Sequence, residues 1–511
     1  MTAAALLLPI PVAVPLLGAG IAMLVPRPVV QRFVSVGILS GLIPVAVALG
    51  VAADRSGHVV LHVGSWPTRL GIALVADRLS TILLVASSIV LLAVLVYSLA
   101  ERESGGRSGQ RDRRLEPGLM HPVYLALAAG VNLAFLTADL FNLFVAIELM
   151  LAASYVLITL APTPARIQAA MTYTVVSLTS SILFLTTIAV FYAATGTVSL
   201  ALLPERVAEL PVPLQTALGL MIFVVFAIKA AVVPLHMWLP DSYPIALTRI
   251  TAVFAALMTK VAIYALIRTQ TLVFPQQLPS ELLLGFALAT LLVGIAGAIT
   301  QDDINRLLSF TLVGHVGYLL FGLALFSSSG LGGTILYLVH HIVLLAALFL
   351  IADLISLDTG SLSLRRLGGI AAVAPVTATL FLTAALSASG VPPLSGFLAK
   401  LALVQAGVRA GGAMPVLTVV GALATSLLTL LVMSRVWSLA FWGRRRHIQR
   451  QARIGARRRV MVAATTALVV TGVAYAVFVG PLAALAGRAA DDLLHPESYR
   501  EALLEEKEGT R

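Results

Sequence analysis

The 511-residue sequence contains no cysteine, few charged residues and only four lysines. Without thiolates, the chain can form neither disulfides nor cysteine-ligated iron–sulfur clusters. Only 11% of the residues are charged and 59% are apolar, and the mean hydropathy is +0.99. These values lie far outside the range of soluble proteins, so the sequence predicts an integral membrane protein.

Signatures of nucleotide and zinc chemistry are also absent. The sequence has no Walker loop, no GxGxxG between a strand and a helix, and no HExxH. We therefore expect no cofactor. The net charge of +11 is typical of some nucleic-acid-binding proteins, but here the arginines gather in short loops between apolar runs. This distribution indicates membrane topology, and no nucleic-acid partner is expected.

Apolar runs of about 20 residues, the length that crosses a bilayer as a helix, recur along the whole chain. We count 14 runs, which predict an all-α membrane fold. The first run lacks a basic start and is followed directly by another, so we interpret it as a retained helix. The runs lie at about 3–25, 32–52, 77–99, 122–138, 140–160, 170–194, 214–239, 247–269, 281–299, 305–327, 331–355, 373–407, 414–438 and 460–486.

Arginines are concentrated in the loops that follow odd-numbered runs. These loops hold Arg27 and Arg32, five arginines within 102–114, Arg365 and Arg366, and eight arginines within 444–459. By the positive-inside tendency these loops are cytoplasmic, and an even number of helices then places both termini outside the cell membrane. We interpret the 444–459 loop as a topology signal in contact with anionic lipid; a specific partner is the alternative.

Three of the four lysines, Lys229, Lys260 and Lys400, lie inside apolar runs. An ammonium group in hydrocarbon costs several kcal/mol by any estimate, so such a residue is a functional hypothesis by default. The pKa of lysine also moves readily on burial, whereas arginine stays charged. Three titratable cations in apolar helices therefore predict proton handling.

The fifth run contains a carboxylate at membrane depth. Glu148 lies eight residues after Leu140, which places it roughly 12 Å into the helix and close to the bilayer midplane. A carboxylate there must be neutral or paired, either as part of a proton relay or as a structural ion pair. Asp139, directly before this helix, is better explained as its N-cap.

The seventh run is interrupted by proline shortly after its lysine. Lys229 lies five residues before Pro234, and proline removes a backbone donor and clashes with the preceding turn, so the helix should break near Lys229. Unwound backbone in a membrane is tolerated where it lines a wet cavity, which predicts a hydrated half-channel ending at the lysine. His236 is an accessory relay candidate, with packing as the alternative.

The twelfth run repeats this design in reverse order. Gly390, Pro392, Pro393 and Gly396 interrupt it, and Lys400 follows the break. In the seventh run the lysine precedes its proline, and this reversal five helices later is what an inverted repeat would leave in a sequence. We therefore expect two inverted five-helix repeats, made of helices 4–8 and 9–13.

Histidines occur in the tenth and eleventh runs. His340 and His341 are adjacent in the sequence and point about 100° apart on a helix, so they cannot share one face. Histidine titrates near neutral pH, which suits a proton relay. Packing is the alternative for both, and also for His315, an accessory candidate. A metal site is not expected, because further ligands are missing nearby.

We expect four regions along the chain. Residues 1–117 hold three scaffold helices and a polar linker, 118–270 form the first proton-channel repeat, and 271–440 form the second. Residues 441–511 contain the basic loop, the last helix and an acidic external tail.

Four motifs give the chain a specific resemblance. They read DLFNLFVAIELMLAASYVLI around Glu148, KAAVVPLHMWLPDSYPIA from Lys229, QDDINRLLSF before His315, and SGVPPLSGFLAKLALVQAG around Lys400. Together they resemble the proton-pumping membrane subunits shared by respiratory complex I and Mrp-type antiporters. The LFNLF-x3-E phrase followed by SY most resembles the MrpD family of multisubunit Na⁺/H⁺ antiporters.

The resemblance implies a 14-helix fold with two inverted five-helix repeats. It also implies a lateral proton route through Glu148, Lys229, Lys260, a relay in helix 11 and Lys400. The implied partners are other membrane subunits of a hetero-oligomeric antiporter, with H⁺ and Na⁺ as the transported ions. Since midplane carboxylates are not clustered in this chain, we expect Na⁺ to bind on another subunit.

The sequence departs from its relatives at two places. Relatives often carry a lysine in helix 11 where this chain has Leu345, so the relay would depend on His340 or His341. Relatives also often carry lysine where this chain has Asn305, in the loop before helix 10.

Three functional hypotheses follow. The first is a proton-translocating subunit of a multisubunit Na⁺/H⁺ antiporter, which is an ion transporter and not an enzyme. The alternative is a proton-pumping membrane subunit of an NADH:quinone oxidoreductase or a membrane-bound hydrogenase, in which the same lysines would serve. A structural scaffold, the third hypothesis, predicts that neutral replacements of the buried charges remain functional.

Overall fold

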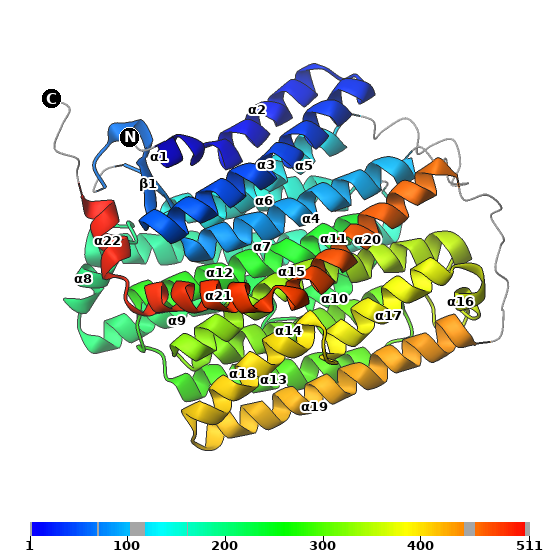
Figure 1. Cartoon of the computed structure of the whole chain (residues 1–511). Helices are drawn as coiled ribbons and strands as arrows, with labels where there is room; N and C mark the ends of the chain where they lie inside the picture. Colours follow the sequence, from blue (N-terminus) through cyan, green and yellow to red (C-terminus); the bar gives the residue numbers. More distant parts are fainter. Residues whose placement is uncertain (1–2, 69–70, 103–117, 161, 444–454, 506–511) are drawn as a thin grey trace.

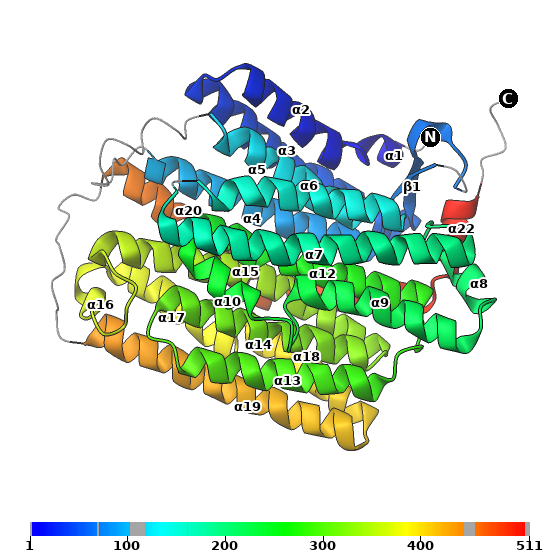
Figure 2. The same ribbon diagram turned by 180° about the vertical axis from the view of Figure 1, so that it is seen from behind.

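The computed structural model describes residues 3–68, 71–102, 118–160, 162–443 and 455–505. Most of the helices run side by side in one bundle (Figures 1 and 2). The N-terminal part consists of α1 (Ala3–Leu7), α2 (Ile10–Leu24), α3 (Pro28–Ser56), β1 (Val59–His62), η1 (Val63–Ser65), β2 (Ala73–Ala76) and α4 (Arg78–Arg102). The strands β1 and β2 pair antiparallel, with Val59 opposite Ala76 and His62 opposite Ala73.

The central part forms two successive helical stretches. The first contains α5 (Met120–Leu136), α6 (Leu140–Ile158), α7 (Pro164–Thr195), α8 (Leu203–Ala208), α9 (Val212–Ala230), α10 (Trp238–Ser242), η2 (Tyr243–Ile245), α11 (Thr248–Val253), η3 (Phe254–Met258), α12 (Thr259–Arg268) and η4 (Thr269–Val273). The second contains α13 (Ser280–Ile299), α14 (Ile304–Ala324), α15 (Ser328–Thr359), α16 (Ile370–Val373), α17 (Pro375–Ser389), α18 (Ser395–Ala410), α19 (Ala413–Val436) and η5 (Trp437–Trp442).

Three helices follow at the C-terminal end: α20 (Ala456–Val477), α21 (Val479–Leu494) and α22 (Glu497–Leu504). Of the described residues, twelve helical segments are long and apolar enough to cross a membrane, and α5 and α17 are shorter apolar helices. These correspond to the 14 predicted runs, so the all-α membrane fold is confirmed.

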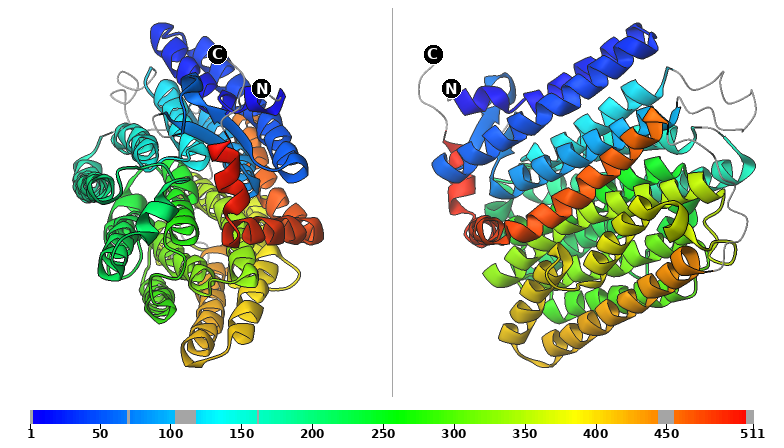
Figure 3. Two further views of the ribbon diagram at one scale, coloured as in Figure 1. Left: turned by 90° about the vertical axis from the view of Figure 1, so that its left-hand side faces the viewer. Right: turned by 45° about the vertical axis from the view of Figure 1, so that its right-hand side comes forward.

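The last predicted run, 460–486, is wrong at its C-terminal end. The spanning helix α20 stops at Val477, and α21 then runs crosswise to it (Figure 3). The charges of α21 explain the turn, because Asp492 accepts from Arg78 at 2.7 Å and Arg488 donates to Asp54 at 2.8 Å. These ion pairs fix α21 to the adjacent ends of α3 and α4.

The two helical stretches share local features at a constant spacing of 164 residues. Helices α7 and α15 each have 32 residues, and α15 begins at Ser328, which is 164 residues after Pro164. Their N-cap side chains, Thr163 and Ser327, accept the backbone amide three residues on. Such a cap is worth about 1 kcal/mol. The caps of α6 and α14, Asp139 and Asp303, also differ by 164, and the predicted N-cap role of Asp139 is confirmed.

Close helix packing repeats at the same spacing. A Cβ added to Gly130 would lie 2.8 Å from the backbone nitrogen of Met150, and one added to Gly294 would lie 2.1 Å from that of Gly314. Both members of the second pair follow those of the first by 164 residues. Only glycine allows helices to approach this closely. These matches support the expected repeat of helices 4–8 and 9–13.

The first and last helices lie at one end of the bundle, and two of the basic turns lie at the opposite end. In Figure 1, α1 and α22 are at the left of the bundle, whereas the α2–α3 turn that holds Arg27 and the α16 region after Arg365 and Arg366 are at the right. This arrangement fits an even number of crossings. The predicted linker core at 103–117, most of the basic 444–459 loop and the end of the acidic tail lie outside the described residues.

Candidate functional site

The break predicted beside Lys229 is present. Helix α9 ends at Ala230, and Ala231 adopts the left-handed conformation with φ 61°. Pro234 and the buried His236 lie in the turn before α10. The indole of Trp238 donates to the carbonyl oxygen of Ile228 at 3.0 Å, which ties the far side of the break to the last turn of α9. Lys229 is therefore held at a helix end whose backbone is locally unwound.

Glu148 and Lys229 are linked through a third side chain. The Lys229 ammonium donates to the Ser181 hydroxyl at 3.1 Å, and the Ser181 hydroxyl donates to Oε1 of Glu148. No direct ion pair joins Glu148 and Lys229 in the described part of the chain. The two charged groups predicted to interact are thus in one hydrogen-bonded chain, with a serine of α7 between them.

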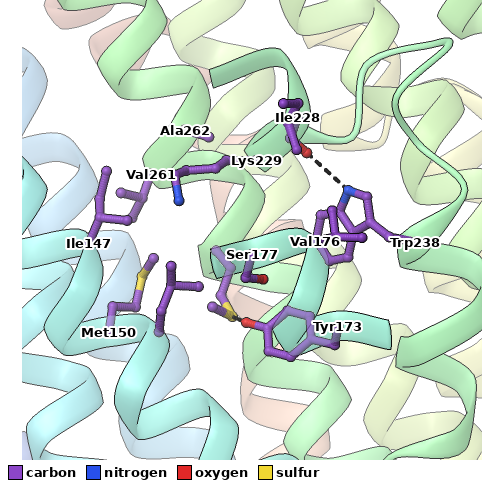
Figure 4. Close-up of a pocket in the computed structure, with 12 residues that line it drawn as sticks. Ile147, Met150, Tyr173, Val176, Ser177, Ile228, Lys229, Trp238, Val261 and Ala262 are labelled. Atoms are coloured by element: carbon purple, nitrogen blue, oxygen red, sulfur yellow. Dashed lines mark hydrogen bonds between the residues drawn. The ribbon is translucent and has the colours of Figure 1, made fainter. Parts of the chain in front are cut away.

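A cleft with about 400 Å³ of empty space adjoins Lys229. Its lining is mainly apolar, and Figure 4 shows the amino group of Lys229 pointing into it between Met150 and Ser177. The hydroxyl of Tyr173, also in the lining, exchanges a hydrogen bond with Ser154 at 2.7 Å. This cleft lies beside the helix break, at the place where the sequence predicts a hydrated half-channel.

Lys260 is more completely buried than Lys229, and the helix that carries it is preceded by a π-helical segment. The segment η3 is a π-helix, and it precedes Lys260 by one turn. The Lys260 ammonium donates to the carbonyl oxygen of Ala255 within this segment. The side chain is 0% exposed. The buried ammonium is therefore held by a backbone carbonyl of its own helix, within a π-helical segment of the kind that is frequent at functional sites.

The histidines of α14 and α15 form a cluster with two tyrosines. The rings of His315 and His341 are 5.1 Å apart, and Tyr337 stacks on Tyr318 at 5.0 Å while its ring centroid lies 5.6 Å from that of His340. His340 bonds Ser395 through Nδ1 at 2.9 Å, whereas the ring nitrogens of His315 and His341 have no hydrogen-bond partner among the described residues. Across the helix interfaces the adjacent histidines therefore meet different partners, Ser395 for His340 and His315 for His341, while Tyr337 of their own helix lies near both rings.

Lys400 follows the second predicted break. Helix α17 ends at Ser389, Gly390 is left-handed with φ 82°, and α18 starts at Ser395 after Pro392 and Pro393. The Lys400 ammonium donates to the carbonyl oxygen of Ala388 at 2.8 Å and lies 4.8 Å from the centre of the Tyr318 ring. A cation over an aromatic face is stabilised by the ring quadrupole.

A second cavity, of about 320 Å³, adjoins the histidine cluster. His340, Ser387 and Ser395 line it together with apolar residues of α20. Ser387 and Ser395 are 3.1 Å apart, so a chain of hydroxyl groups leads from His340 to the break before Lys400. Each of the two breaks therefore has a cavity beside it.

Helix packing links the segments that carry these groups. Helix α9 packs against α12, η3 packs against α15, and α15 packs against α14 and α18. Helix α6, which carries Glu148, reaches α9 and Lys229 through α7, which packs against both. Lys260 lies in α12 directly after η3, and it is η3 that packs against the helix of His340 and His341. No group of three metal-ligating side chains occurs within the described ranges.

The sequence did not identify Ser181, Tyr318, Tyr337 or Ser395. One signal was available for Ser181, because it lies 164 residues before Leu345, the position at which we expect a departure from the family pattern. Leu345 itself is fully buried. Asn305 donates to Thr248 at 3.1 Å near the start of α14, a contact that holds two helix starts together.

Comparisons with known proteins show the family of this chain. The family described as NADH:quinone oxidoreductase/Mrp antiporter, TM, matches residues 137–429. The D-type Na⁺/H⁺ antiporter subunit of Alkalihalophilus pseudofirmus is 36% identical over 93% of this chain and 94% of that protein. The D-type Na⁺/H⁺ antiporter subunit of Bacillus subtilis is 33% identical over 88% of this chain and 89% of that protein.

Two solved structures are similar over nearly the whole chain. A chain of the Mrp complex from Dietzia sp. superimposes with a TM-score of 0.88 at 32% identity, covering 99% of this chain and 100% of the other. A chain of an archaeal membrane-bound sulfane sulfur reductase gives a TM-score of 0.83 at 21% identity, covering 98% and 100%, and shows the same fold. This chain therefore belongs to the NADH:quinone oxidoreductase/Mrp antiporter family of membrane subunits.

Proposed function

We propose that this chain is the proton-translocating subunit of a multisubunit Na⁺/H⁺ antiporter. The observation that carries the proposal is the succession of titratable side chains through the helix bundle: the half-buried Glu148 and Lys229, followed by the buried Lys260, His340, His341 and Lys400. The relatives named as Na⁺/H⁺ antiporter subunits, matched over most of their length, favour this function over a redox-driven complex.

Protons would enter at the cleft beside the α9 break and pass by successive protonation from Lys229 to Lys260, the histidine cluster and Lys400. Ionised Glu148 stabilises the charged Lys229 through Ser181, and neutralisation of Glu148 removes that stabilisation. Moving one charge across the membrane is worth about 2.3 kcal/mol per 100 mV, so modest electrostatic coupling between neighbouring sites would be sufficient. His236 and His315 would be accessory groups.

The partners would be the other membrane subunits of the complex, one of which would carry the Na⁺ site. Within this chain, residues 118–270 and 271–440 would form the two proton-channel repeats. Residues 1–117 and 441–511 would flank them, and the features repeated at 164 residues support this division.

Replacing Glu148 with glutamine should lower Na⁺-dependent proton flux by about tenfold, the change that corresponds to 1.4 kcal/mol in one charge interaction. The measurement is the collapse of a pH gradient on Na⁺ addition, in everted vesicles that contain the full set of neighbouring subunits. Glu281→Gln, at the exposed start of α13, is the control and should retain wild-type flux.

Wild-type flux in Glu148→Gln would disprove the role of this carboxylate. Activity that appears only when NADH or hydrogen is supplied would move the chain to the redox-driven alternative. A scaffold would keep its flux after neutral replacement of each buried charge.

We also propose that both termini face the exterior of the cell membrane. Because the chain lacks cysteine, any introduced cysteine is a unique label site. Ser280→Cys should react with an impermeant maleimide in intact cells, and Arg366→Cys should react only in everted vesicles. Both side chains are exposed in the structure, and the reverse labelling pattern would overturn the assigned orientation.

A further inference from the structure

Ser181 differs from the other hydroxyl residues of its helix in what it bonds. Thr172, Thr179 and Thr187 of α7 each donate to the carbonyl oxygen four residues earlier. This is the usual use of a hydroxyl within a helix. Ser181 instead bonds two charged side chains from two other helices, Glu148 of α6 and Lys229 of α9. The Ser181 hydroxyl therefore bonds side chains of the site and not a carbonyl oxygen of its own helix.

Ser181 is also more deeply buried than the groups it joins. It is 5% exposed, whereas Glu148 and Lys229 are both of intermediate exposure. A buried hydroxyl has one proton to donate and lone pairs to accept, so it can accept from an ammonium and donate to a carboxylate at the same time. The Ser181 hydroxyl does both, because it accepts a hydrogen bond from the Lys229 ammonium and donates one to the Glu148 carboxylate.

We propose that Ser181 is the positioning and proton-bridging residue between Lys229 and Glu148, an inference that rests on the function proposed above. In the transfer, the Lys229 ammonium gives a proton to Oγ of Ser181 while the hydroxyl proton passes to Oε1 of Glu148. The products are a neutral amine, an unchanged hydroxyl and a neutral carboxylic acid. One proton has moved and both charges have been neutralised, without a change of the serine.

The bridge also gives the pair its geometry. Because Lys229 contacts Ser181 and not Glu148 directly, the distance between the ammonium and the carboxylate is set by α7. Removing the hydroxyl would leave the two charges without the group that joins them. Without the hydroxyl, the free-energy difference between the charged and the neutral forms of the Lys229–Glu148 pair changes. The pH at which flux is half-maximal should change with it.

The test compares four versions of the assembled complex in everted vesicles: wild type, Ser181→Ala, Ser181→Thr and Ser180→Ala. Ser180 is the matched control, since it is a fully buried serine of the same helix whose hydroxyl donates to the backbone oxygen of Val225 at 3.3 Å. Flux should fall by about 10- to 100-fold in Ser181→Ala, the factor that a hydrogen bond to a charged group represents. Its pH profile should shift, whereas Ser181→Thr and Ser180→Ala should retain flux and profile.

Equal flux and an unchanged pH profile in Ser181→Ala would overturn the bridge. A loss that Ser181→Thr does not rescue, with an unshifted profile, would also overturn it and leave Ser181 a packing residue. If Ser181→Ala does not accumulate, Ser181→Cys replaces it, because a thiol fills the space and is a weak donor. Reduced flux in that variant supports the bridge, and wild-type flux refutes it.

A parallel Lys229→Ala variant separates this inference from the proposed function. Loss of flux in Lys229→Ala with normal flux in Ser181→Ala rejects only the bridge. Normal flux in both variants rejects the proton route through this chain as well.

Discussion

Replacing Lys260 with methionine should lower Na⁺-dependent proton flux by more than about 100-fold, as expected for loss of an obligatory proton carrier. The same replacement should leave the protein as stable as the wild type or make it more stable. Lys260 is fully buried, and its one hydrogen bond among the described residues goes to the Ala255 carbonyl. Methionine is similar in length, so it fills the site without a buried charge to desolvate.

The two expected results for Lys260→Met, loss of flux and unchanged or higher stability, distinguish a proton relay from a structural scaffold. A lysine that only holds helices together would lose stability on replacement and keep its flux. The measurements are flux in everted vesicles and the midpoint of thermal unfolding of the purified complex. Thr259→Val is the matched control, because Thr259 is the fully buried neighbour and its replacement keeps the volume. Normal flux in Lys260→Met would remove Lys260 from the route.

Asp77→Asn should destabilise the protein by about 3–5 kcal/mol, the cost of leaving one member of a buried ion pair without its partner. Asp77 and Arg268 pair with side-chain exposures of 3% and 7%. Arg268 also donates to the Tyr264 hydroxyl at 3.1 Å and lies 5.1 Å from the ring centre of Tyr499 in α22. The pair therefore joins the start of α4, the end of α12 and the C-terminal helix.

The matched control for this prediction is Asp241→Asn. Asp241 pairs with Arg306 at 3.0 Å, but the two side chains are 46% and 44% exposed. A solvated pair contributes about 0–1 kcal/mol, so this variant should unfold close to the wild type. Thermal unfolding of the purified complex compares the two variants. The double variant Asp77→Asn/Arg268→Met should recover much of the stability. Equally small losses of stability in Asp77→Asn and Asp241→Asn would show instead that the Arg268 charge is compensated without Asp77.

The two adjacent histidines of α15 show what could be predicted from the sequence and what could not. The adjacency of His340 and His341 predicted that they face different directions, because successive residues on a helix differ by about 100°. The structure then decided which neighbour each histidine meets: Ser395 for His340 and His315 for His341. Those neighbours come from α18 and α14, and their approach depends on how three helices are rotated against one another.

The sequence by itself determined the spanning helices, the N-cap at Asp139 and the two helix breaks. Each of these depends on properties of a short segment, such as its hydropathy or the missing N–H of proline. Only the tertiary structure decided that Ser181 bridges Glu148 and Lys229, that Lys400 lies over Tyr318, and that α21 turns across the bundle end. These contacts join residues from separate helices, and in an almost uniformly apolar chain the hydrophobic pattern does not fix the rotation of each helix, so the partners are set by packing.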